Sequence, residues 1–208
     1  MLETMVRYFV ILMAIVAVPA TAVEPAILSP DQRIAIGRIE DYLNNVTTLE
    51  ARFVQIAEDG MAEGQIYLSR PGKMRVEYDP PVPILMVASP PWVMYHDSKL
   101  DQTSFVLTSR TPATFFLREN ISLNDGITIT NFEQTRGAVR LSMITEDNPD
   151  AGSITVVLEY QPMRLVKWIV VDAQGKRIET ALLNPRFGVA LDKKLFSIID
   201  PRRNKDRD

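Results

Sequence analysis

Arg70 is the residue in this sequence whose side chain most clearly needs specific hydrogen-bond partners, because the pattern places it on an apolar face. The stretch 64–78 contains two alternating, strand-like runs joined at Arg70-Pro71-Gly72, where Pro and Gly favour a chain reversal. A connecting loop of odd length puts Arg70 in phase with the apolar side chains of both runs. These side chains are Ile66, Leu68, Met74, Val76 and Tyr78. A guanidinium in such surroundings needs acceptors, so we expect carbonyl groups of a covering segment to reach it.

Other reactive side chains give little indication of catalysis. The chain has no cysteine and one histidine, which excludes thiol chemistry and a Cys/His zinc site. That histidine, His96, is expected on a solvent-facing turn, and Glu58, Asp59 and Glu63 are interpreted as a solvated acidic loop. The sequence lacks a phosphate-binding loop, a GxSxG nucleophile elbow and an HExxH pair. We therefore predict a protein that is not an enzyme and needs neither a cofactor nor a metal.

The amino terminus predicts export. Arg7 precedes an apolar run that ends in the small residues Ala20-Thr21-Ala22, which is typical of a signal peptide spanning 1–22 and cleaved after Ala22. The run is short for a membrane span, and a retained anchor is the alternative. We expect one domain over 23–200 and a disordered polar tail over 201–208. A net charge of −3 gives no sign of nucleic-acid binding, although the basic tail could contact anionic lipid or a partner.

Two helical segments are predicted outside the strand-rich region. The first begins after Ser29, which serves as the N-cap of a capping box, and presents Ile36, Ile39 and Leu43 on one face. The second is a short helix over 112–119, in which Phe115, Phe116 and Leu117 spread too widely to share one stripe. We expect at least one of these three side chains to face a cavity. Residues 191–199 fit either a helical turn or an edge strand.

From residue 49 onward the apolar period changes to two, which indicates β-strands. Eleven strands are expected, at 49–57, 63–70, 73–79, 83–88, 91–96, 100–106, 127–135, 138–146, 153–161, 164–172 and 176–186. Short connections rich in Pro, Gly, Asn and Asp separate them, so an antiparallel meander is predicted. A sheet of this width closes, splits into a sandwich or curls. The pattern alone leaves open whether the apolar side is a filled core or a ligand cavity.

Several motifs in fixed order resemble the periplasmic lipoprotein carrier family of the LolA type. They are Phe53-x-Gln55, the stretch 64–81, Trp92-Val-Met-Tyr95 and Thr111-Pro112-x-x-Phe-Phe-Leu117. The resemblance implies a mainly β (α+β) fold, an unclosed antiparallel barrel of about eleven strands with a lid of short helices. It also implies a monomer located in the periplasm. The sequence departs from the family pattern at Met74, where an aromatic residue is common, and at 88–91, where an Asp-Gly turn is usual.

The same resemblance implies function. Family members receive triacylated lipoproteins from an ABC-type release complex of the inner membrane and pass them to an outer-membrane receptor or the outer membrane itself. In this family the arginine of an Arg-Pro pair fastens the lid, so the resemblance implies that Arg70 is the lid latch. We expect Ile36, Ile39 and Leu43 to belong to a lid helix. The predicted lipid-cavity residues are Ile66, Leu68, Met74, Val76, Trp92, Met94, Phe115, Phe116 and Leu117, with Met61 and Met86 nearby.

Two alternatives remain at this point. One is an envelope-stress sensor module of the same fold, which normally carries a second domain that this chain is too short to include. The other is an unrelated lipid-binding barrel of the lipocalin kind, which would have eight strands around one enclosed ligand.

Overall fold

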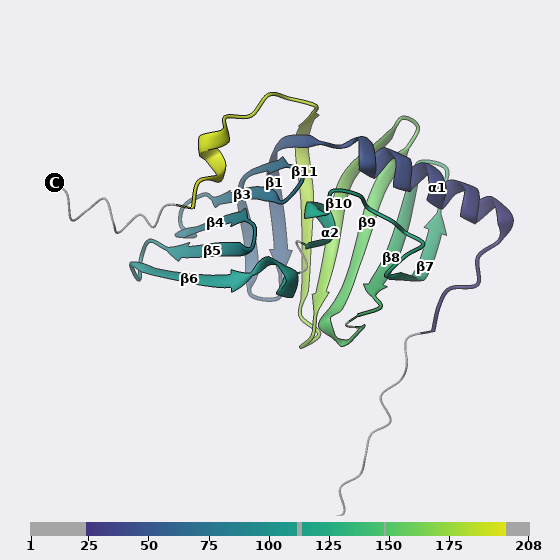
Figure 1. Cartoon of the computed structure of the whole chain (residues 1–208), viewed down its shortest axis with the longest axis horizontal. Coiled ribbons are helices and arrows are strands. Elements are labelled where there is room, and N and C mark those ends of the chain that lie inside the picture. Colours follow the sequence, from purple (N-terminus) through teal and green to yellow (C-terminus); the bar gives the residue numbers. More distant parts are fainter. Residues whose placement is uncertain (1–23, 112–113, 148, 199–208) are drawn as a thin grey trace, which may run out of the picture.

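One antiparallel sheet forms the body of the molecule. The computed structural model describes residues 24–111, 114–147 and 149–198. In chain order the strands are β1 (Thr48–Ala57), β2 (Gly60–Ser69), β3 (Lys73–Tyr78), β4 (Ile84–Ser89), β5 (Trp92–Asp97), β6 (Gln102–Leu107), β7 (Ile127–Gln134), β8 (Ala138–Thr145), β9 (Gly152–Tyr160), β10 (Met163–Asp172) and β11 (Arg177–Phe187). Their order across the sheet is β6-β5-β4-β3-β2-β1-β11-β10-β9-β8-β7 (Figure 1). The predicted eleven-stranded, unclosed meander is confirmed, and it excludes an eight-stranded closed barrel.

The hairpin of β2 and β3 has the predicted register. Ser69 pairs with Lys73 across a three-residue loop, and Leu68 then pairs with Met74 and Ile66 with Val76. Gly72 in this loop adopts a positive φ of 81°, which costs glycine little. Because the loop has an odd number of residues, the apolar side chains of both strands face the same side.

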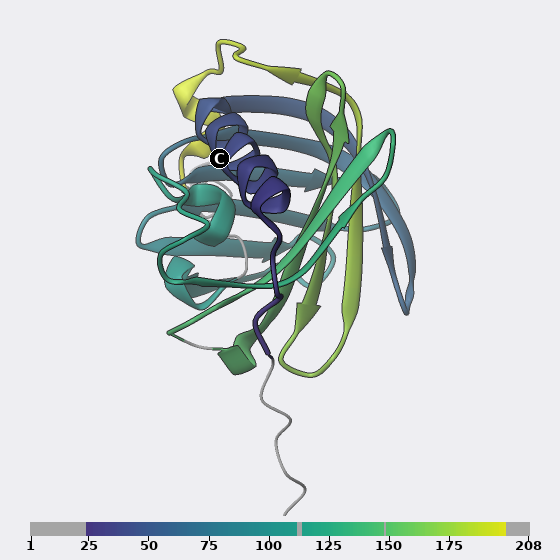
Figure 2. The same cartoon turned by 90° about the vertical axis from the view of Figure 1, so that its right-hand side faces the viewer.

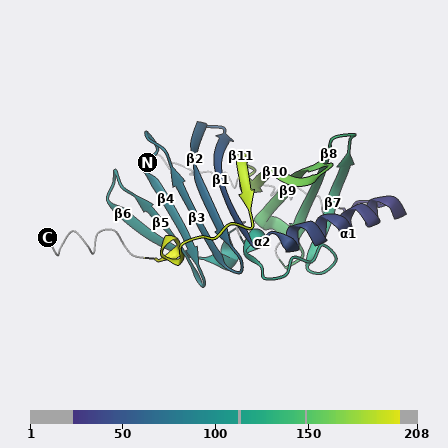
Figure 3. The same ribbon diagram turned by 90° about the horizontal axis from the view of Figure 1, so that it is seen from above.

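The sheet is strongly curved, and helix α1 lies across its concave side (Figures 2 and 3). Helix α1 (Pro30–Asn45) begins with the predicted capping box: the Ser29 backbone N–H donates to Gln32 Oε1 at 2.8 Å, and the Gln32 N–H donates to Ser29 Oγ at 3.3 Å. Its buried side chains, Ile36, Ile39 and Leu43, join the main core. The helix covers β7–β10, whereas no helix covers β3–β6 in the same way (Figure 1).

Shorter helical pieces complete the chain: η1 (Thr108–Arg110), α2 (Thr114–Leu117), η2 (Pro149–Ala151) and η3 (Lys193–Phe196). Helix α2 is shorter than the predicted 112–119, although 112–113 lie outside the described residues. Of the two possibilities for 191–199, the structure has the helical turn, η3, which contacts β3 and β4. Arg75 Nη1 fixes it by donating to Leu195 O at 3.2 Å.

The expectation for His96 is wrong. Strand β5 extends past this residue, so His96 is part of the sheet and not of the turn after it. Only 6% of the residue is exposed, and its Nδ1 lies 3.0 Å from Thr103 Oγ1. The prediction failed because a polar residue just before a turn was expected to face solvent. In the structure the His96 side chain lies on the convex side of the sheet, where the Thr103 hydroxyl is its hydrogen-bond partner.

The predicted signal peptide at 1–22 and the polar tail at 201–208 lie outside the described residues. No helix in the described part of the chain is long and apolar enough to cross a bilayer.

Candidate functional site

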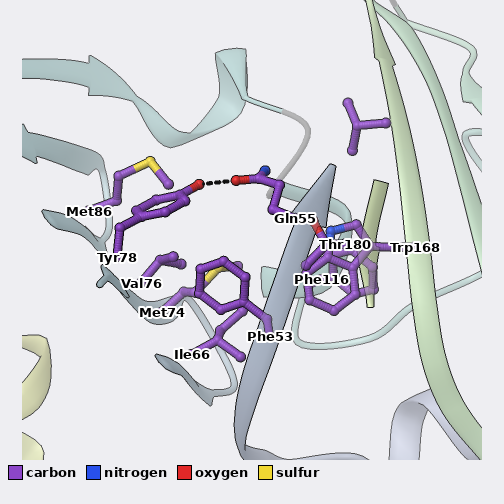
Figure 4. A pocket seen from close by; sticks show the side chains of 11 residues that line it. Phe53, Gln55, Ile66, Met74, Val76, Tyr78, Met86, Phe116, Trp168 and Thr180 are labelled. Atoms are coloured by element: carbon purple, nitrogen blue, oxygen red, sulfur yellow. Dashed lines mark hydrogen bonds between the residues drawn. The ribbon is translucent and has the colours of Figure 1, made fainter. Parts of the chain in front are cut away.

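An apolar cavity of about 130 Å³ lies on the concave side of the sheet (Figure 4). Its walls come from β1–β4 on one side, from β10 and β11 on the other, and from α2. The lining residues are Phe53, Gln55, Ile66, Met74, Val76, Tyr78, Met86, Phe116, Trp168, Val170 and Thr180. This volume approaches that of an apolar cavity of about 150 Å³ that can hold benzene.

None of the described residues that line this cavity is charged. Of its polar groups, the Tyr78 hydroxyl donates to Gln55 Oε1 (Figure 4), so the amide and the phenol satisfy each other. Burial raises the pKa of Tyr78 above its ordinary value, and the phenol is therefore neutral at physiological pH. An uncharged cavity with paired polar groups favours an apolar ligand over an ionic one.

Helix α2 closes the cavity with aromatic contacts. The rings of Phe116 and Trp168 lie 5.1 Å apart between centroids, with an interplanar angle of 53°. Phe115 packs edge-on against Phe116 at 5.2 Å. A four-residue helix has little stability of its own, because nucleation is costly, so these contacts must hold it in place.

Arg70 connects the sheet to both helices. Its Nε donates to Arg118 O at 2.9 Å and its Nη2 to Glu119 O at 3.1 Å, just after α2. Its Nη1 donates to Leu43 O and, at 3.2 Å, to Val46 O at the end of α1. The carbonyl acceptors predicted for Arg70 are thus present, and they belong to two covering segments.

The electrostatics of Arg70 follow from its surroundings. Desolvation lowers the pKa of the guanidinium, and none of the ion pairs among the described residues includes it. An arginine nonetheless stays charged in a protein. Backbone carbonyls at a helix C-terminus carry partial negative charge and lack intrahelical partners, so they are suited to a cation that has no carboxylate.

Helix α1 also holds the chain that follows α2. Asn44 Nδ2 donates to Ile121 O at 2.9 Å, while Asn44 Oδ1 accepts from the Ile121 N–H at 2.8 Å. One turn earlier, Glu40 Oε2 accepts from the Leu123 N–H at 2.6 Å. The segment 118–123, the strap, is therefore fixed to α1 by side-chain contacts and to β2 through Arg70.

The structure brings together some of the predicted cavity residues. Ile66, Met74, Val76 and Phe116 line the cavity, as does Met86. Leu68, Phe115 and Leu117 are buried in the adjoining core and do not line it. Met61 is 67% exposed and lies away from it.

Trp92 and Met94 do not face the cavity, which corrects the prediction. Met94 pairs with Val87, and Val87 pairs with Arg75. Arg75 lies between the cavity residues Met74 and Val76 and so faces the opposite side of the sheet, as do Val87 and Met94. A two-residue turn after Ser89 fixes this phase, because Ser89 pairs directly with Trp92. Met94 is buried on the convex side and Trp92 is 44% exposed.

Six cavity residues were missed. Phe53, Gln55 and Tyr78 lie on β1 and β3, close in the sequence to residues that were predicted, and Trp168, Val170 and Thr180 lie on the distant strands β10 and β11. The alternation of the last three places them on one face of β10 and β11, and that part was readable from the sequence. Their position opposite β1–β3 depends on the pairing of β1 with β11, which are more than a hundred residues apart in the chain.

No group of three or more His, Cys, Asp or Glu side chains within the described ranges could hold a metal ion.

Comparison with known proteins identifies the family. The sequence model of a family described as "Outer membrane lipoprotein carrier protein LolA" matches residues 44–199, well over half of the chain. The chain belongs to this family.

Curated relatives agree with the family assignment, and a solved structure shares the fold. An outer-membrane lipoprotein carrier protein of Methylococcus capsulatus is 27% identical over 79% of this chain and 83% of its own length. One from Pseudomonas paraeruginosa is 26% identical over 88% of this chain and 92% of its own. A crystal structure from Vibrio parahaemolyticus, provisionally described as an outer membrane lipoprotein-sorting protein domain, has a TM-score of 0.50 at 13% identity. It covers 79% of this chain and 95% of that one, and it supports the fold alone.

Proposed function

We propose that this protein is a periplasmic carrier, which binds the acyl chains of lipoproteins in the cavity and moves them from the inner membrane to the outer membrane. The observation that carries the proposal is an uncharged cavity closed by α2, whose position depends on a guanidinium that binds only carbonyl and amide oxygens. Family membership gives the lipoprotein as the class of cargo.

The cavity must enlarge to accept this cargo. A volume near 130 Å³ suits a benzene-sized group and is too small for even one long acyl chain. Phe116 is the lining residue contributed by α2, so displacement of α2 opens the cavity toward the side where Arg70 holds the strap. In this arrangement Phe116 occupies space that an acyl chain would take.

The free energy of binding must also be limited, because a carrier has to release its cargo. Each buried methylene contributes about 0.8 kcal/mol, so complete sequestration of several acyl chains would make binding effectively irreversible. Breaking the hydrogen bonds of Arg70 and the contact between Phe116 and Trp168 costs free energy and offsets part of that gain.

Transport between the two membranes requires a partner at each of them. An ABC-type release complex of the inner membrane loads the carrier, and an outer-membrane receptor or the membrane itself accepts the lipoprotein. The proposal requires export with cleavage after Ala22, so amino-terminal sequencing of periplasmic protein should begin at Val23. Recovery of Met1 in a membrane fraction would contradict this location.

The carrier role is tested by mass spectrometry of lipid that co-purifies with the exported protein. We expect a triacylated amino-terminal peptide. Met86→Glu, which places a carboxylate in the cavity, should abolish the co-purifying lipopeptide. Leu85→Glu is the matched control, because the neighbouring residue of β4 faces the opposite side and its variant should keep the cargo. Free fatty acid, or no lipid at all, would contradict the proposal.

A further inference from the structure

The two outer edges of the sheet are protected very differently. Strand β7 is covered by the amino-terminal segment, where the Ala26 N–H donates to Ile129 O at 2.8 Å. It also has a bulge between Ile129 and Asn131 and carries Glu133, and both features discourage another strand from pairing. Strand β6 forms the other edge, and no described segment pairs with its outer side (Figure 1).

Strand β6 has the properties of an edge that accepts a partner. Its sequence, Gln102–Leu107, contains no charged residue, no proline and no bulge against β5. Phe105 is 46% exposed on one face and Val106 45% on the other, and Trp92 and Tyr95 of β5 lie beside them at 44% and 39%. An uncharged edge with exposed apolar side chains on both faces is the kind that folded proteins normally avoid.

The backbone groups of this edge can be assigned from the hydrogen-bond pattern. The Thr108 N–H donates to Pro91 O at 2.9 Å, just beyond the pair formed by Leu107 and Trp92. In an antiparallel ladder, consecutive residues alternate between bonding the neighbouring strand and pointing away from it. Phe105 therefore directs its N–H and C=O groups to the open side, and Leu107 directs its N–H there, while the Leu107 C=O belongs to the first turn of η1.

An apolar groove of about 300 Å³ begins where β6 ends. The turn between β2 and β3, the turn between β4 and β5, the start of η1, and both ends of α2 form its walls. The lining residues are Gly72, Pro90, Pro91, Leu107, Thr108, Ser109, Thr114, Leu117 and Arg118. Leu107 thus belongs both to the open edge and to the groove.

We propose that the β6 edge and this groove together form a docking site for an extended, apolar segment of a partner protein. The occupant is a polypeptide because the open N–H and C=O groups of Phe105 and the open N–H of Leu107 are satisfied by another backbone, and acyl chains have no such groups. Recognition by strand addition works in this way: main-chain hydrogen bonds give affinity, and pockets for side chains give specificity. The segment therefore pairs with β6, contacts Phe105 and Val106 with apolar side chains, and places a larger apolar side chain in the groove.

This site is separate from the acyl cavity, with which it shares no lining residue. It goes beyond the carrier role, since it concerns how a partner protein holds the carrier. The groove does contact Thr114 and Leu117 of α2 and Arg118 of the strap. A docked segment is consequently in position to contact the helix that closes the cavity.

The test uses the exported protein and a fluorescent peptide of defined composition, an acetylated and amidated chain of alternating threonine and valine that ends in leucine. We expect saturable binding by fluorescence anisotropy. A peptide of the same sequence, N-methylated at alternate amides so that one edge cannot pair, should bind at least tenfold more weakly.

Variants of the edge separate backbone pairing from side-chain contact. Phe105→Pro removes an outward-facing N–H at a position where an edge strand tolerates proline, and it should weaken binding at least tenfold. Phe105→Ala keeps the N–H and should weaken binding only a few-fold. Leu107→Lys puts a charge at both the edge and the groove, so it blocks the site even if the proline variant fails to fold.

Four results would overturn the proposal: no saturable binding, equal binding of the N-methylated peptide, equal affinity of Phe105→Pro and Phe105→Ala, or no effect of Leu107→Lys. Two more would assign the edge to another occupant. One is a dimer in sedimentation velocity that Phe105→Pro dissociates. The other is binding to phosphatidylethanolamine and phosphatidylglycerol vesicles that Leu107→Lys abolishes. The lipopeptide test with Met86→Glu is independent of all of these results.

Discussion

One continuous sheet has two halves that are packed in different ways. In the half formed by β7–β10, inward-facing side chains such as Val139, Leu141 and Val156 are completely buried beneath α1. In the half formed by β3–β6, the inward-facing Met86 is only half-buried and Val106 is 45% exposed. The inward-facing side chains are apolar in both halves, but α1 covers only those of β7–β10 (Figure 1).

This contrast shows how one fold combines a stable body with an adaptable site. A long capped helix supplies enough apolar surface to fill one half, whereas the four residues of α2 cannot fill the other. Aromatic contacts hold α2, and Arg70 binds the carbonyl groups that follow it. Under the proposed function, the half that α1 leaves uncovered is the part of the molecule that changes its packing when cargo binds.

Matched methionine substitutions give the largest expected difference between the halves. Met143→Ala in β8 removes a completely buried side chain and should lower the free energy of unfolding by about 2–5 kcal/mol. Met86→Ala in β4 removes a half-buried side chain that already borders a cavity, so the loss should be about 1 kcal/mol. Urea denaturation measures both, and equal losses would show that the halves are packed alike.

Loss of Arg70 should release helix α2 and the strap without unfolding the sheet. Arg70→Leu leaves the carbonyl groups of two helix ends without their donor, which should lower the free energy of unfolding by about 1–3 kcal/mol. Cargo should be held more firmly and transferred poorly to acceptor membranes, because an apolar side chain replaces a charged one. Arg70→Lys, which keeps the charge but not the planar fork, should have an intermediate effect.

Hydrogen exchange shows which segment is released when Arg70 is replaced. Amides of 114–118 should exchange far faster than those of 66–68 in the wild type, faster still in Arg70→Leu, and differently after an acylated peptide is added. Normal transfer with unchanged stability and unchanged exchange in Arg70→Leu would remove Arg70 from the mechanism.

The smallest expected effect concerns a charged cluster on the convex face of β10 and β11, formed by Lys167, Arg177 and Glu179. Hydrogen bonding by Lys167, with a further contribution from Arg177, holds the pKa of Glu179 below its usual value. The resulting stabilisation is fully present above the unfolded pKa of about 4.3 and is lost as pH falls through the lower folded pKa. Glu179→Gln should cost less than about 1 kcal/mol at pH 7.

Urea denaturation of Glu179→Gln and wild type at pH 7 and pH 3, with and without high salt, checks this prediction. The difference between the two proteins should shrink at low pH and in salt. A difference that persists at pH 3 would mean that Glu179 acts through packing and not through charge.

Local patterns were sufficient to predict most of the fold. The eleven strands, the capping box at Ser29 and the three-residue loop after Ser69 each follow from residues close together in the sequence. The need of Arg70 for carbonyl acceptors also followed from its phase alone. By contrast, the phase of β5 was assigned one residue out of step, because Pro90-Pro91 makes a two-residue turn that the sequence did not specify.

The composition of the cavity was harder to predict, because it depends on which distant strands meet. Trp168 faces the cavity only because β10 lies beside β11, and β11 pairs with β1. The burial of His96 likewise depends on the position of β5 in the sheet, which a single histidine does not reveal.

The two tryptophans allow the most direct test of the cavity, because they lie in contrasting places and are the only ones in the chain. Trp168 lines the cavity, and Trp92 is exposed on the convex side. In Trp92→Phe, a triacylated lipopeptide with brominated acyl chains should quench the fluorescence of Trp168 strongly and saturably. In Trp168→Phe, the same lipopeptide should leave the fluorescence of Trp92 nearly unchanged. Equal quenching in the two variants, or quenching of Trp92 alone, would contradict acyl-chain binding in the cavity.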